Sequence, residues 1–179
     1  MVHADRTIGA DLGGTGVGGS GMRGQLARYA LLPLRLFLGG TFIYAGLDKL
    51  TDPGFLAASG TGSLAETLRQ VHDAAALPQL VELAQQSPVG FGYAIAIGEL
   101  AVGVGTLIGL LGRLAAFGGA LISLMLWLTV SWSIEPYYYG SDLAYLMAWV
   151  PLIFAGAPML SLDKAMTTRR SRHGAQLFG

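Results

Sequence analysis

Long uncharged apolar stretches alternate with short polar segments along most of this chain. Four windows of about 20 residues, at 29–47, 89–111, 114–134 and 143–162, contain at most one charged residue each. A helix rises about 1.5 Å per residue and the hydrocarbon core of a bilayer is about 30 Å thick, so each window is long enough to cross a membrane. The last two windows lack the polar face that a core helix of a soluble domain keeps. The pattern predicts an all-α, polytopic membrane protein built as a bundle of four transmembrane helices.

The composition agrees with this interpretation and narrows the chemistry. Hydrophobic residues make up 53% of the 179 residues and charged residues only 12%, against roughly 25% charged in a soluble domain. Eleven basic residues balance eleven acidic ones, so the net charge gives no reason to expect a nucleic-acid partner. Cysteine is absent and the three histidines are His3, His72 and His173. We therefore predict no haem, no metal site and no cofactor bound by this chain.

Basic residues outside the windows predict the orientation of the bundle. Lys and Arg are retained on the cytoplasmic side during insertion. They flank the first window on its N-terminal side, lie in the turn between the second and third windows, and follow the fourth. We expect a multi-pass protein of the plasma membrane with both termini in the cytoplasm. The residues concerned are Arg6, Arg23, Arg28, Arg113, Lys164, Arg169, Arg170 and Arg172.

The chain divides into a membrane domain between two tails. Residues 1–25 are rich in glycine and predict a flexible cytoplasmic tail, and residues 163–179 predict a basic cytoplasmic tail. The four-helix membrane domain is expected to occupy residues 26–162.

The segment between the first two windows is too long for a simple turn and should contain structure of its own. Ser63 followed by Glu66 is a capping-box pattern. A second short helix is expected from Pro78, a residue favoured in the first helical turn, to Gln86. We expect this extracytoplasmic loop to form a helical cap on the outer surface of the membrane. The expected apolar faces are Leu64, Leu68 and Val71 in the first helix and Leu80, Val81 and Ala84 in the second.

Two ionisable residues fall at membrane depth, where such a residue faces the bundle interior and has a partner. Arg35 lies in the first window and Glu99 in the second. The two helices are antiparallel, and the axial offset between these residues is about 6 Å at 1.5 Å per residue. We expect an Arg35–Glu99 ion pair across the interface. This ion pair has either a structural role, in which it fixes the register of the two helices, or a role in the function of the protein.

Small residues accompany the charges on both helices. Such stripes usually permit close helix packing. The alternative is a seam with little side-chain bulk that a flat quinone ring enters. The stripes are Arg35, Gly39, Phe42, Gly46 and Lys49 on the first helix and Gly92, Ala96, Glu99 and Gly103 on the second, with Gly105 and Gly109 further along.

The loop between the third and fourth windows carries three consecutive tyrosines at 137–139. Tyrosines at this position are ordinarily anchors at the membrane–water interface. Glu135 and Asp142 flank them, which leaves open a polar outer pocket facing the basic residues of the first loop.

Two stretches resemble a known family of membrane proteins. Residues 34–50 read LRLFLGGTFIYAGLDKL and are followed by Asp52 and Pro53, which resembles the first helix of DoxX and DoxD proteins. Residues 137–142, YYYGSD, and 148–152, AWVPL, resemble the DoxD branch in particular. The resemblance covers about residues 30–158.

The resemblance implies a protein similar to the small subunit of thiosulfate:quinone oxidoreductase, which joins two thiosulfates to tetrathionate and passes two electrons to quinone. On this hypothesis Arg35 polarises a quinone carbonyl, Glu99 relays protons and Tyr44 is a second proton donor. Quinone is then a membrane co-substrate. Thiosulfate or another small anion is expected to bind through Lys49, Arg69, Tyr138, Ser141 and Asp142.

Two other functions fit the same sequence. The bundle could be a non-enzymatic accessory or assembly subunit of a respiratory or redox-protective complex, with its small-residue faces against partner helices. A transporter for a small anion is a third class, although no inverted repeat is evident. Besides the lipid bilayer, a partner subunit or a second copy of the chain is therefore expected.

Overall fold

The computed structural model describes residues 29–109 and 111–155, and all regular structure in these ranges is helical. This confirms the predicted all-α class. The predicted tails and the end of the fourth window lie outside the described residues. The helices are α2 (Leu32–Thr51), α3 (Leu64–Val71), α4 (Pro78–Gln85), α5 (Pro88–Ile108), α6 (Gly112–Thr129) and α7 (Ser141–Ala155), with short 3-10 turns η1 (His72–Ala74) and η2 (Tyr137–Tyr139).

Each predicted window corresponds to one long helix, but the helices differ in how well they suit a bilayer. By length and composition α5 and α6 can cross a membrane, and only 39% and 28% of their apolar windows are buried, unlike core helices of a soluble protein. The apolar helix α7 has 15 described residues, and α2 has 20 but carries Arg35, Asp48 and Lys49. Four transmembrane spans therefore stay a prediction.

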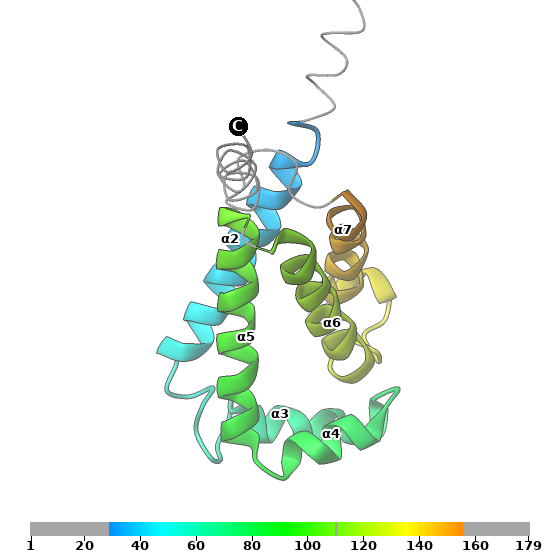
Figure 1. The fold of residues 1–179 in the computed structure, drawn as a ribbon. Coiled ribbons are helices and arrows are strands. Elements are labelled where there is room, and N and C mark those ends of the chain that lie inside the picture. The colour runs from blue at the N-terminus through cyan, green and yellow to red at the C-terminus, as the bar shows by residue number, and fades with distance from the viewer. Residues whose placement is uncertain (1–28, 110, 156–179) are drawn as a thin grey trace, which may run out of the picture.

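The long helices pack in two pairs. Helix α2 packs mainly on α5 and α6 mainly on α7, while α5 also contacts α6 and α2 contacts α7. Figure 1 shows α3 and α4 lying across one end of this bundle, below α5 and α6. We call α3, η1 and α4 the cap.

Backbones of α2 and α5 touch because the predicted glycine stripes face each other. A Cβ atom built on Gly46 would lie 2.6 Å from the Ala96 carbonyl oxygen, and one on Gly103 would lie 2.8 Å from the Gly39 carbonyl oxygen. No real Cβ approaches another atom so closely. The packing interpretation is confirmed for Gly39, Gly46 and Gly103, and at these points the interface has no space for a methyl group or for a quinone ring.

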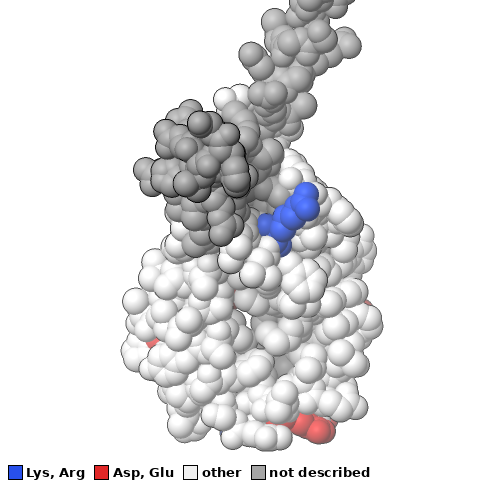
Figure 2. Space-filling model, viewed as in Figure 1, with Lys and Arg blue, Asp and Glu red and all other residues white. Residues whose placement is uncertain are grey.

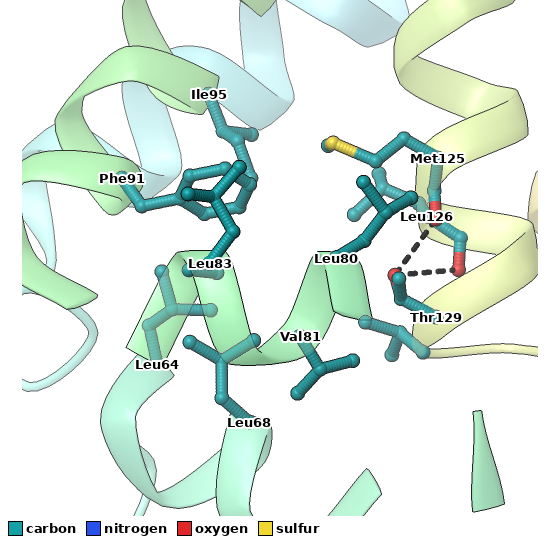
Figure 3. Close-up of a pocket in the computed structure, with 12 residues that line it drawn as sticks. Leu64, Leu68, Leu80, Val81, Leu83, Phe91, Ile95, Met125, Leu126 and Thr129 are labelled. Atoms are coloured by element: carbon teal, nitrogen blue, oxygen red, sulfur yellow. Dashed lines mark hydrogen bonds between the residues drawn. The ribbon is translucent and has the colours of Figure 1, made fainter. Parts of the chain in front are cut away.

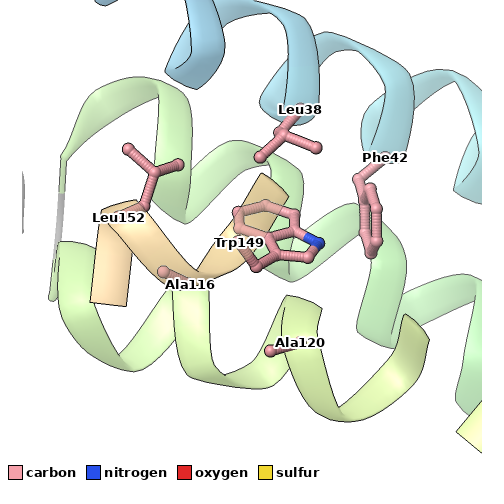
Figure 4. Close-up of a cluster of buried hydrophobic side chains, with 6 residues drawn as sticks. All are labelled: Leu38, Phe42, Ala116, Ala120, Trp149 and Leu152. Atoms are coloured by element: carbon pink, nitrogen blue, oxygen red, sulfur yellow. The ribbon is translucent and has the colours of Figure 1, made fainter. Parts of the chain in front are cut away.

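Trp149 of α7 fills the core between the two helix pairs (Figure 4). Its side chain is fully buried, and its ring meets the Phe42 ring edge-on at a centroid distance of 4.9 Å. Gly119 provides the room, since a Cβ there would collide with the indole. Helix α7 is thereby fixed against both α2 and α6. The buried members of this cluster are Leu38, Phe42, Ala116, Ala120, Trp149 and Leu152.

The cap forms much as its sequence predicts. The Ser63 hydroxyl accepts a hydrogen bond from the Glu66 amide at 3.2 Å, which is half of a capping box. The Glu66 carboxylate does not return to Ser63 but pairs with Arg69 at 2.6 Å. The second helix begins at Pro78 as expected. Leu64, Leu68, Val81 and Ala84 form a small core of their own between the two cap helices.

Charged groups are rare on the surface of the bundle. In the face that Figure 2 shows, one basic patch lies toward the upper end of the described part and one acidic patch lies at the lower end. The wide belt between them is uncharged apart from small acidic spots at its two edges. Exposed apolar side chains of the long helices include Phe37, Ile97 and Phe117. Such a belt suits contact with lipid chains rather than water.

His72 connects the cap helices electrostatically. Its Nδ1 lies 2.8 Å from the Asp73 carboxylate and its Nε2 lies 3.5 Å from the Glu82 carboxylate of α4. The hydrogen bond to Asp73 is the main cause that raises the pKa of His72, and Glu82 adds to it.

We predict that changing Gly46 to Ala destabilises the bundle, because the added methyl group meets the α5 backbone. Overpacking of this kind costs about 1–3 kcal/mol. Gly40→Ala is the matched control, because a Cβ at Gly40 meets nothing within 4 Å. Thermal unfolding in detergent micelles should show a lower midpoint for Gly46→Ala alone. Equal midpoints for the two variants would contradict the close contact.

We also predict that the cap is more stable when His72 is protonated. A pKa raised by folding gives stability that is fully present below the unfolded pKa, about 6.5. That stability is lost as the pH rises through the folded pKa. NMR titration of the His72 ring should give a pKa above 6.5, lowered by Asp73→Asn. A folded pKa at or below 6.5 would contradict the contacts described.

Candidate functional site

A buried ion pair joins the two helices that the glycine contacts bring together. The Lys49 ammonium lies 2.9 Å from one oxygen of the Glu99 carboxylate and 3.1 Å from the other. The Glu99 side chain is 4% exposed and that of Lys49 is 22% exposed. Glu99 is therefore held inside the bundle, while Lys49 forms the more accessible side of the pair. The Lys49 ammonium also lies 6.0 Å from the centre of the Phe55 ring.

A second carboxylate stands near this pair. Asp142, at the start of α7, lies within electrostatic range of both Lys49 and Glu99. Its carboxylate accepts a hydrogen bond from the hydroxyl of Ser131, a buried residue just after α6. Lys49 with Glu99, and Asp142 with Ser131, are two contacting pairs of polar side chains, and we call these four residues the polar cluster. Its members come from α2, α5, α7 and the segment after α6.

The expected Arg35–Glu99 ion pair is wrong. The Arg35 guanidinium instead donates to the carbonyl oxygens of Thr106, at 2.6 Å, and of Leu107. These carbonyls belong to the last turn of α5, where the helix offers no amide partners of its own. Arg35 therefore binds one end of α5 rather than its middle.

Side-chain direction explains why Lys49 takes the place expected for Arg35. Gly46 lies against the turn of α5 that contains Glu99, and the rise from Gly46 is about 4.5 Å to Lys49 but about 16 Å to Arg35. Side chains on a helix lean toward its N-terminus. In antiparallel helices this turns Lys49 and Glu99 toward each other and Arg35 away from Glu99.

The remaining predicted site residues do not join the polar cluster. Tyr44 is 72% exposed on the outer face of α2. Arg69 pairs with Glu66 on the cap surface. Tyr138 is exposed and its ring meets those of Tyr137 and Tyr139 edge-on, as in an interfacial aromatic belt. Ser141 is exposed at the start of α7.

Two residues at this site, Ser131 and Phe55, were not predicted from the sequence. Ser131 is hidden at the end of an uncharged apolar window, where only its hydroxyl marks it as a possible partner. Phe55 is an apolar residue in an irregular loop, and nothing in its neighbourhood in sequence connects it with Lys49.

The polar cluster can hold and move protons, but it is poorly suited to bind an anion. With all three groups ionised, one ammonium and two carboxylates leave a net charge of −1, which repels a dianion. A carboxylate and an ammonium in contact can instead pass a proton to a neutral polar ligand. Within residues 29–109 and 111–155 there is no group of three His, Asp or Glu side chains that could hold a metal ion.

Fold and site together define a helical membrane protein with a buried charge pair between its closest helices. The chain belongs to the DoxX family, whose sequence model matches residues 30–132. That range contains α2, the cap, α5 and α6, and ends just after Ser131. Searches of curated proteins and of solved structures found no match.

We predict strong coupling between Lys49 and Glu99 in stability. Lys49→Met leaves a buried carboxylate without its partner, which costs about 3–5 kcal/mol. The double variant Lys49→Met with Glu99→Gln removes both charges and should recover much of that loss. Thermal unfolding in micelles measures each variant. Additive effects of the two substitutions would show that the pair contributes no coupling.

Proposed function

We propose that this chain is the quinone-reducing membrane subunit of an oxidoreductase of the DoxD type, which passes electrons from thiosulfate to membrane quinone. Reduction of a quinone to a quinol consumes two electrons and two protons. The chain's part in that reaction is to supply protons inside an apolar bundle. The polar cluster is the observation that carries this proposal.

The positions of Glu99 and Asp142 support a role in proton transfer. Glu99 is almost fully shielded and Lys49 is partly exposed, so the pair connects the bundle interior with its surface. Asp142 and Ser131 form a second hydrogen-bonded pair with exchangeable protons. An intramembrane ionisable group with a named partner is, by default, a candidate for proton relay.

Quinone does not enter between α2 and α5 in this proposal, because the backbones of the two helices are in contact at Gly46 and Gly103. Lys49 is the partly exposed member of the pair, and a quinone carbonyl beside it would accept a hydrogen bond from the ammonium. We therefore assign to Lys49 the polarising role that the sequence suggested for Arg35. Arg35 acts by holding the end of α5.

Thiosulfate oxidation belongs to another part of the assembly in this proposal. The two basic side chains expected to bind the anion each have a carboxylate partner, Glu99 for Lys49 and Glu66 for Arg69. A partner subunit that supplies unpaired basic groups would complete the donor site. This assigns the quinone half of the reaction to the present chain.

We predict that Glu99→Gln lowers thiosulfate-dependent quinone reduction by about 10²-fold, the contribution of one positioned proton-transfer group. The assay uses the full chain in nanodiscs with any co-purifying subunit, and follows quinol and tetrathionate together. Glu66→Gln, which changes a carboxylate on the cap surface, is the matched control and should keep full activity.

The double variant Lys49→Met with Glu99→Gln separates function from folding. It should unfold near the wild-type temperature and remain inactive. Full turnover in this variant would remove the polar cluster from the mechanism. Absence of turnover in the well-folded wild type, with respiratory or redox-protective subunits bound to it, would support an accessory role instead.

A further inference from the structure

An apolar cavity of about 140 Å³ lies between the cap and the bundle (Figure 3). Leu80 and Leu83 of α4 face it from one side, and Ile95 of α5 and Met125 of α6 face it from the other. None of the residues of the polar cluster lines it. The cavity is therefore separate from the site proposed for proton transfer.

The lining offers a ligand almost nothing polar. Thr129 has the one side-chain hydroxyl among the lining residues, and it already donates to the Met125 carbonyl of its own helix at 2.7 Å. Water needs two to four polar partners to occupy a buried site, so this cavity favours an apolar occupant.

Size and access limit the occupant further. An apolar protein cavity of about 150 Å³ takes up benzene, so this one suits a hydrocarbon fragment of about six carbon atoms. Leu83 lines the cavity and is also 58% exposed, which places an entrance beside it.

We propose that the cavity under the cap binds a hydrocarbon chain from the surrounding membrane. Two sources share this chemistry: the acyl chain of a bilayer lipid and the prenyl tail of a quinone. The site stands independently of the reaction proposed above, because its lining and its ligand need no charged residue. A bound chain would make van der Waals contacts with the side chains of α4, α5 and α6 that face one another across the cavity.

Photolabelling of the full chain in nanodiscs tests the proposal. One sample contains phosphatidylcholine with a diazirine within an acyl chain, and another contains a prenylated quinone with a diazirine in its tail. We expect adducts on the buried residues Val81 and Ala84. The sample in which these residues are labelled identifies the source of the bound hydrocarbon chain. Adducts confined to lipid-facing residues such as Phe117 and Leu121 in both samples would overturn the proposal.

Two variants show whether the label depends on the cavity. Ala84→Leu fills the cavity and should abolish labelling of Val81. Ala101→Leu makes the same change on an exposed face of α5 and should leave the labelling of Val81 unchanged. Leu80→Ala enlarges the cavity and should increase labelling, which keeps the test decisive should Ala84→Leu fail to fold. Unchanged labelling in either cavity variant would overturn the proposal.

Discussion

The direct contact between the backbones of α2 and α5 is the constraint on which the rest of the structure depends. Gly46 against Ala96, and Gly39 against Gly103, leave no freedom to slide one helix along the other. Fixing this register decides which charges meet. A shift by one turn would move the Lys49 ammonium away from the Glu99 carboxylate, and an unpaired carboxylate inside the bundle is strongly unfavourable. Packing thus determines the electrostatics of the site.

Much of the fold could be predicted from the sequence because lipid imposes simple rules. Apolar windows gave each long helix, and the glycine stripes gave the faces of α2 and α5. The cap was predictable from Ser63 and Pro78, which are local signals for the first turn of a helix. Such signals depend only on residues close in sequence, so they can be interpreted without knowledge of the tertiary structure.

The charge pairing was less predictable because it depends on direction as well as position. Aligning the middles of the two windows placed Arg35 about 6 Å from the level of Glu99, whereas the contact of Gly46 with α5 puts Arg35 about 16 Å away along the helix axis. The alignment also ignored the lean of side chains toward each helix N-terminus. Ser131 and Asp142 meet only because the loop between α6 and α7 returns the chain to the end of α6. Loop conformation of this kind leaves little trace in the pattern of apolar residues. The roles predicted for the exposed Tyr44, Tyr138 and Ser141 stay predictions.

The attachment of Arg35 to α5 has a consequence for how the protein is made. The carbonyl groups that accept its hydrogen bonds lie 71 and 72 residues further along the chain, so they are synthesised well after α2 has left the ribosome. Until α5 has been made, these two hydrogen bonds of the Arg35 guanidinium cannot form. The final position of α2 therefore depends on a helix that is synthesised later, and α2 and α5 complete their packing together rather than one after the other.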